Sequence, residues 1–155
     1  MLSYRNKLYQ NYNTNQVNQS GRHSFSQKFI EESEWLSKEI LPLIQDKKEL
    51  QILDIGCGNG SLLHACKLAG YTKIIGIDIS AEQVMLAHQL GITEVKHAET
   101  IEYLNSTPDQ YDVIFCMGII EHFTKDELVV LLDLVKSRMN DQARIIIRTP
   151  NMDTP

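Results

Sequence analysis

The 155-residue chain has a formal net charge of -5 and 43% hydrophobic residues, values that are ordinary for one globular domain. The acidic balance argues against nucleic-acid binding, because phosphate contacts require a basic face. Every apolar run falls well short of the ~20 residues of a membrane helix, and the first residues lack an apolar signal core. We therefore expect a cytoplasmic protein that contacts neither nucleic acid nor membrane.

Helix and strand patterns alternate along the chain after an N-terminal segment, residues 1–25, that is rich in Asn and Gln. The expected helices cover residues 26–46, 60–70, 81–90, 101–105 and 125–140, and the expected strands cover 51–55, 73–78, 94–97, 111–117 and 143–148. Gly70 and Gly91 stand where helix C-caps favour a left-handed residue, and Ser80 and Thr124 are good N-caps. The strands are nearly continuous apolar runs, as in parallel sheets that are buried on both faces. The sequence thus predicts a doubly wound, mostly parallel α/β domain over residues 26–155.

The most informative stretch is residues 50–60, LQILDIGCGNG, where an apolar strand leads into Asp54 and three glycines at alternate positions. Glycine is required where the backbone takes a positive φ or where a ligand touches the main chain. The amides at the start of the following helix then point at the ligand. A plain strand-to-helix connection is the alternative, but one glycine would suffice for it.

The chemistry of the ligand follows from the neighbouring acids. The spacing G-x-G-x-G differs from the dinucleotide fingerprint G-x-G-x-x-G, whose last glycine would fall at Ser61. The Asp54 carboxylate would repel a pyrophosphate but accept hydrogen bonds from an amine. Asp78 ends the second apolar strand about 20 residues beyond the glycines, where a βαβ unit presents a carboxylate to ribose hydroxyls. Capping of the next helix is the alternative role for Asp78.

These motifs resemble the class I S-adenosylmethionine-dependent methyltransferases, which have a Rossmann-like fold. The resemblance rests on DIGCGNG for the cofactor loop, GIDIS for the ribose acid, and YDVIFCMGIIEHF for the fourth strand and its exit. A further run, EHFTKDEL followed by RIIIRTPN, resembles the subset encoded with bacterial surface-polysaccharide genes. The resemblance implies an enzyme (EC 2.1.1.-) that methylates a small molecule or a saccharide and releases S-adenosylhomocysteine.

The resemblance also implies which residues bind the cofactor, from its methionine part to its adenine. They are Asp54, Gly56, Cys57, Gly58, Asn59 and Gly60 for the methionine part, Asp78 for the ribose, Ile79, Ala98, Glu99 and Thr100 for the adenine, and Met117 and Gly118 near the sulfonium. Many family members have Asp near the position of Glu99. In the family the N-terminal segment often covers the cofactor, and Tyr12 and His23 would then line the substrate pocket; a flexible tail is the alternative.

Methyl transfer needs little covalent help from the protein, because the cofactor carries an activated methyl group. A hydroxyl nucleophile gains from a base whose pKa is near neutrality, and His122, just past the fourth strand, is the first candidate, with Glu121 the second. A histidine that bonds backbone beside the cofactor is the alternative. Cys57 stands between two glycines more plausibly for its size than as a nucleophile. The three cysteines and five histidines show no metal-ligand spacing, so we expect no metal.

The sequence departs from the resembled family in two places. The turn before the fifth strand commonly reads Pro-Gly-Gly, whereas here it would be Met139, Asn140 and Asp141. The sequence stops at Pro155, soon after the fifth strand, where the resembled fold continues, so we expect a truncated chain or a natural fragment. The fifth strand would then be an exposed sheet edge, and an apolar edge recruits a partner. We therefore expect a homodimer through that edge or its neighbouring helix.

Two other functions stay open at this point. One is a cofactor-binding module without turnover, and the other is an NAD-dependent oxidoreductase, which the glycine spacing disfavours.

Overall fold

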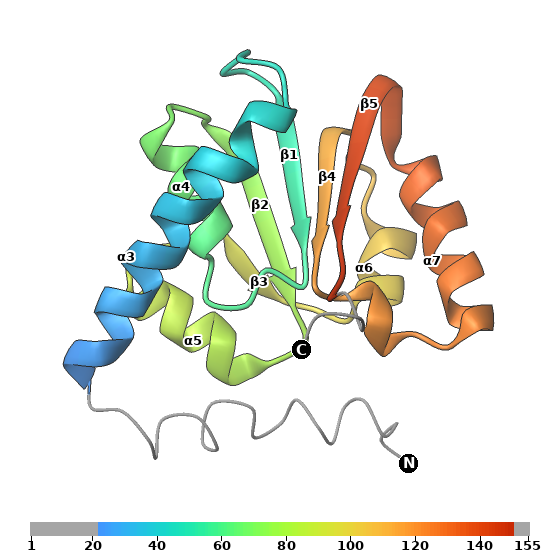
Figure 1. Cartoon of the computed structure of the whole chain (residues 1–155). Coiled ribbons are helices and arrows are strands. Elements are labelled where there is room, and N and C mark those ends of the chain that lie inside the picture. Colours follow the sequence, from blue (N-terminus) through green and yellow to red (C-terminus); the bar gives the residue numbers. More distant parts are fainter. Residues whose placement is uncertain (1–21, 151–155) are drawn as a thin grey trace.

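A five-stranded parallel sheet forms the centre of the computed structural model, which describes residues 22–150, with side chains from residue 26 on (Figure 1). The strand order is β3-β2-β1-β4-β5. The strands are β1 (Gln51–Ile55), β2 (Lys73–Asp78), β3 (Val95–His97), β4 (Tyr111–Met117) and β5 (Met139–Arg148). The helices are α3 (Arg22–Glu39), α4 (Ser61–Leu68), α5 (Ala81–Gln89), α6 (Thr100–Ser106) and α7 (Lys125–Ser137), with short 3-10 helices η1 (Leu41–Leu43) and η2 (Ile120–His122). The predicted doubly wound parallel fold is confirmed.

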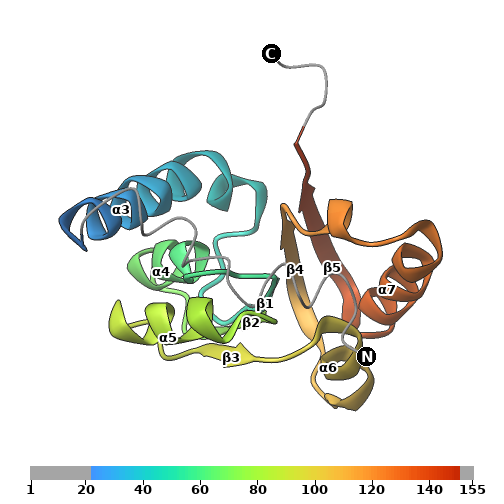
Figure 2. The ribbon, with the colours of Figure 1, turned by 90° about the horizontal axis from the view of Figure 1, so that it is seen from below.

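Helices cover both faces of the sheet. α3, α4 and α5 lie on one face, and α6 and α7 lie on the other (Figure 2). Along β1, Ile52 belongs to the first core and Leu53 to the second, so successive side chains alternate between the two faces. On β4, Phe115 and Ile114 do the same, and all four side chains are fully buried. Burial on both faces explains why these strands are continuous apolar runs, each side chain contributing about 1.5–3 kcal/mol.

The order of the strands places the site. From β1 the chain moves outward through β2 to β3, and then returns past β1 to β4 and β5. The direction of the crossovers therefore reverses between β1 and β4, which are direct neighbours in the register Leu53 to Ile114. In open parallel sheets, the crevice at the carboxyl ends of the strands at this reversal point is where ligands bind.

Most predicted boundaries are close to the observed ones, and those of β1, β2 and β4 are the same. The first helix was predicted to run to residue 46, but α3 ends at Glu39 and η1 follows. Pro42 explains the break, because a proline lacks the amide that the helix ladder needs and restricts the residue before it. The start of α3 at Arg22 also lies earlier than predicted, inside the N-terminal segment.

The fifth strand begins earlier than predicted, at Met139 and not at residue 143. The predicted turn at Met139, Asn140 and Asp141 is wrong, because β5 already begins at Met139. An irregular register between Tyr111 and Val113 of β4 accommodates the polar residues, and the Asn140 side-chain amide donates to Asp112 Oδ1 at 2.7 Å. The helix η2 was not predicted.

The predicted caps are present. Gly70 and Gly91 have φ values of +89° and +86°. The Ser80 hydroxyl accepts from the Gln83 amide, and Thr124 forms a complete capping box with Glu127 at the start of α7. Ser80 and Thr124 thus begin helices that follow the carboxyl ends of β2 and β4, whereas Gly70 and Gly91 end helices at the opposite edge of the sheet.

Candidate functional site

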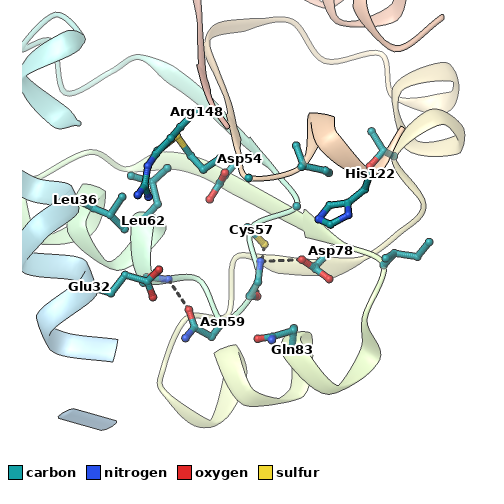
Figure 3. A pocket seen from close by; sticks show the side chains of 18 of the residues that line it. Glu32, Leu36, Asp54, Cys57, Asn59, Leu62, Asp78, Gln83, His122 and Arg148 are labelled. Atoms are coloured by element: carbon teal, nitrogen blue, oxygen red, sulfur yellow. Dashed lines mark hydrogen bonds between the residues drawn. The ribbon is translucent and has the colours of Figure 1, made fainter. Parts of the chain in front are cut away.

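A cavity of about 370 Å³ opens at the carboxyl ends of β1, β2 and β4, where the strand order reverses (Figure 3). Most of the predicted site residues line it, namely Asp54, Gly56, Cys57, Gly58, Asn59, Asp78, Ile79, Glu99, Thr100, Met117, Gly118 and His122. Three do not: Gly60 is the N-cap of α4, Ala98 packs against the second core, and Glu121 lies exposed outside the lining. Tyr12 lies outside the described residues, and of His23 only the backbone, within α3, is described.

Sequence reasoning missed the wall of the cavity. α3 contributes Glu32 and Leu36, η2 and its flanks contribute Ile119 and Phe123, and β5 contributes Arg148. Ile119 and Phe123 fall within the run YDVIFCMGIIEHF and Arg148 within RIIIRTPN, but neither run indicates that these side chains reach the cavity, because the fold sets their place. For α3 the local signal is the i, i+4 spacing of Glu32 and Leu36 on one face of the helix.

The glycine loop takes the conformation that its sequence predicts. Gly56, Gly58 and Gly60 have φ values of +70°, +54° and +80°, in the left-handed region. At Gly56 a Cβ would also lie 2.6 Å from Ile119 Cδ1, so this glycine allows the loop to pack against the segment after β4. The glycines thus serve both backbone conformation and close packing, which a plain connection would not need.

Cys57 is held by the sheet beneath it. A Cβ at Gly76, on β2, would lie 2.6 Å from Cys57 Sγ, so the strand glycine makes room for the thiol. Burial raises the pKa of Cys57 well above its ordinary value, and the nearby Asp54 carboxylate raises it further. A thiol in that state is a poor nucleophile at neutral pH, which agrees with the size interpretation of this residue.

Asp78 connects the loop to the second strand. Its Oδ2 accepts from the Gly58 amide and its Oδ1 from the Ser80 amide, each at 2.8 Å, and Figure 3 shows the first bond beside the cavity. The bond to Ser80 is a local turn that precedes α5, and Ser80 itself is the N-cap of that helix, so Asp78 does not take the alternative capping role. Burial raises the pKa of Asp78, and the two amides oppose that shift. Each oxygen keeps a second lone pair, so the carboxylate can also accept from ligand hydroxyls.

Asp54 is the most unusual group in the site. Its side chain is 2% exposed, and its Oδ1 has no hydrogen-bond partner within the described part of the chain. Its pKa is raised well above the ordinary value, first by burial and then by the negative charges of Asp78 and Glu32. A buried carboxylate without a partner is costly, so the site is built for a hydrogen-bond donor or cation supplied by a ligand.

His122 reaches the cavity from η2, where its amide donates to the Ile119 carbonyl at 3.0 Å. Figure 3 shows its ring on the same side of the cavity as Asp78. Among the described residues no three His, Cys, Asp or Glu side chains gather in a way that could hold a metal ion. No helix in residues 22–150 is long and apolar enough to cross a membrane.

A glycine loop after β1, with a buried acid before it and a second acid at the end of β2, is an arrangement by which α/β domains bind nucleoside cofactors, and comparison with known proteins specifies the class. A family model described as "Methyltransferase domain" matches residues 25–155. The chain therefore belongs to this methyltransferase family, and the predicted resemblance to the class I S-adenosylmethionine-dependent methyltransferases is confirmed.

Similar proteins agree in fold and class. The ubiquinone biosynthesis O-methyltransferase of Aeromonas salmonicida is 32% identical over 106 residues, which cover 65% of this chain and 43% of that enzyme. A solved structure of a SAM-dependent methyltransferase from Archaeoglobus fulgidus is 32% identical, with a TM-score of 0.69, and the match covers 86% of this chain and 60% of that one. Magnesium protoporphyrin IX methyltransferase from Synechocystis, 20% identical, shares the fold with a TM-score of 0.67 over 95% of this chain and 76% of its own. The chain spans less than half the length of the curated relatives it matches.

Proposed function

We propose that the chain binds S-adenosylmethionine in this cavity and transfers its methyl group to a small-molecule acceptor. The observation that carries the proposal is the buried Asp54 carboxylate, directly beside the glycine loop, whose Oδ1 has no hydrogen-bond partner in the part of the chain that the structure describes. A cationic amino group is the ligand feature that would satisfy it, and the cofactor has one at its methionine end. A dinucleotide would bring a pyrophosphate to the same place, where the acids would repel it.

The residues present fit the cofactor along the length of the cavity. Asp54 and the loop from Gly56 to Gly60 would hold the methionine part, and Asp78 would accept from the two ribose hydroxyls. Ile79, Glu99 and Thr100 would border the adenine. Met117 and Gly118, at the exit of β4, would stand near the sulfur, with Ala98 behind the adenine edge. Support comes from the shared lining of one cavity by nearly all of these residues.

The bound cofactor supplies a methyl group that is already activated by a positive sulfur. The protein's part is then to align the acceptor and to exclude water. We propose His122 as the group that takes the proton from an acceptor hydroxyl, because it lines the cavity beyond Met117 and Gly118. Glu121, exposed on the same short helix, is the second candidate. We expect His122→Ala to keep cofactor affinity and lose turnover on a true acceptor.

The acceptor class rests on the relatives. The curated relatives are O-methyltransferases of ubiquinone biosynthesis, which favours a small-molecule acceptor with a hydroxyl group. The run RIIIRTPN keeps a saccharide of a surface polysaccharide as the narrower alternative. Catalysis by the chain, as opposed to cofactor binding without turnover, is part of this proposal, because the chain spans less than half of those enzymes. We also propose a cytoplasmic location.

A homodimer remains our proposal for the quaternary structure. β5 is an edge strand of the sheet, and Ile147 on it is 42% exposed. Val129 and Val130 on the neighbouring α7 are also exposed. Apolar surface of this kind on a sheet edge favours association. A monomer in light scattering at working concentration would remove the proposal.

Isothermal titration with S-adenosylhomocysteine tests the function first. Asp78→Ala should abolish or greatly weaken binding, because it removes the only acid proposed for the ribose. The test variant is informative only if it folds, so circular dichroism of both samples is the control. Titration with NADH should give no heat; binding of NADH in place of S-adenosylhomocysteine would overturn the proposal in favour of an oxidoreductase.

A further inference from the structure

Arg148 is a cavity residue that no sequence motif of the cofactor site includes. It is the last residue of β5 and lines the cavity, and Figure 3 shows it near Asp54. Its carbonyl accepts from the Gly118 amide at 2.8 Å, which fixes the end of β5 against the exit of β4. Figure 3 shows the side chain reaching from the strand end toward Leu36 and Leu62. The backbone of Arg148 is thus anchored while its guanidinium extends across the cavity.

The guanidinium is held by α3. Its carbon lies 4.6 Å from the centroid of the Trp35 ring, a cation-π contact that joins the ends of β5 and α3. A stacked guanidinium keeps its N–H edge free for a planar acceptor, which is the geometry that binds a carboxylate through two hydrogen bonds. Within the described residues Arg148 forms no ion pair with a carboxylate. The arrangement is a positioned donor without a carboxylate acceptor among residues 26–150.

The other charged groups at this end of the cavity are acids. Asp54 is buried, and its Oδ1 has no partner among the residues described; Glu32, on the same helix as Trp35, lines the cavity as well. Arg148 is the only Lys or Arg among the described cavity residues. One guanidinium beside two carboxylates is complementary to a zwitterion, because an amino acid carries one carboxylate and one ammonium group on the same α-carbon.

We propose that Arg148, held on Trp35, binds the α-carboxylate of the cofactor's methionine part, while Asp54 and Glu32 face its ammonium group. This inference rests on the proposed function and deepens it, since it assigns the recognition of the amino-acid end to a residue of β5 and a tryptophan of α3. We assign Arg148 to the carboxylate of the cofactor and not to an acidic methyl acceptor. Arg148 and Asp54 then bind the carboxylate and the ammonium group of the same amino-acid moiety. Arg148 is accordingly a specificity determinant against nucleosides that lack the carboxylate.

Paired ligands make the test sharp. S-Adenosylhomocysteine and its decarboxylated analogue, S-adenosyl-3-thiopropylamine, differ only in the carboxylate, and titration calorimetry measures both. The wild type should bind S-adenosylhomocysteine about 10- to 100-fold more tightly than the analogue, as expected for a charged bidentate contact. Arg148→Ala should lose that preference: its affinity for S-adenosylhomocysteine should fall by the same factor, and its affinity for the analogue should stay at the wild-type level. Arg148→Lys should give an intermediate loss, because it keeps the charge but not the fork.

The chain offers a matched control on the same strand. Arg144 lies four residues before Arg148 in the middle of β5, outside the cavity, and its guanidinium donates to the Leu43 carbonyl at 3.0 Å. Arg144→Ala should leave both affinities at the wild-type level. Equal weakening of both ligands by Arg148→Ala would show a merely structural role, and no weakening of either would show that the carboxylate binds elsewhere. Either result would overturn the inference while leaving the proposed function standing, whereas failure of the wild type to bind S-adenosylhomocysteine would overturn the function itself.

Discussion

Gly56 allows the packing of the cofactor loop to be tested separately from its backbone conformation. At φ +70° an alanine is strained by about 1–2 kcal/mol. The added Cβ would also lie 2.6 Å from Ile119 Cδ1, an overlap that overpacking data place at about 1–3 kcal/mol. We therefore expect Gly56→Ala to lower the free energy of unfolding by about 2–5 kcal/mol. Urea denaturation followed by circular dichroism measures it.

Gly91 is the matched control for that prediction. It has a similar φ of +86°, but nothing lies within 4 Å of its would-be Cβ. Gly91→Ala should thus show the backbone strain alone, about 1–2 kcal/mol. Ile119→Val removes the clashing Cδ1. The double variant Gly56→Ala with Ile119→Val should therefore lose less stability than the sum of the losses in the two single variants. A loss in Gly56→Ala no greater than in Gly91→Ala, or strict additivity in the double variant, would refute the reasoning.

Three further predictions follow from the site and its flanks. The raised pKa of Asp54 means that the folded apo protein holds this proton more tightly than the unfolded chain, so its contribution to stability is present at low pH and is lost as pH rises through the folded-state pKa. Asp54→Asn should remove that part of the pH dependence of urea unfolding and lower the affinity for S-adenosylhomocysteine. An unchanged pH profile would contradict the raised pKa of Asp54. Burial of the Cys57 thiol predicts that it resists iodoacetamide at pH 7.5 in native protein and reacts after unfolding, as mass spectrometry of labelled peptides would show. Thr124→Ala breaks the capping box of α7 and should cost about 1 kcal/mol, or roughly 2–4 °C in Tm by calorimetry; no shift would mean that the cap is dispensable.

The fold and the floor of the site could be predicted because their signals are local. An apolar strand, alternate glycines and an acid at the next strand end specify a βαβ unit within about 30 residues, and the boundaries of β1 and β2 came out as predicted. Helix caps such as Thr124 and Gly91 are equally local. Pro42 carried a signal that was not used, since it marks the end of α3 in the sequence itself.

The wall of the cavity could not be predicted in the same way. Trp35 and Arg148 are far apart in sequence, and their contact depends on how α3 and the end of β5 are placed around the sheet. The start of β5 could not be predicted either, because its residues are polar and show no apolar strand pattern. Asn140 is held there by its hydrogen bond to Asp112, next to an irregular register in β4. Such contacts are properties of the tertiary structure, and a single sequence gives no period or spacing from which to read them.

The charges that line the cavity make the electrostatic free energy of the empty site differ from that of the ligand-bound site. Burial disfavours an ionised Asp54, and repulsion from the negative charges of Asp78 and Glu32 adds to that cost in the empty site. A ligand that brings an ammonium group to Asp54 relieves this repulsion, and one that also brings a carboxylate to Arg148 adds a second favourable contact. Binding should therefore stabilise the fold by more than the ligand's apolar burial alone, and the site favours zwitterionic nucleosides over neutral ones. The same acids that destabilise the empty cavity thus determine which ligand it selects.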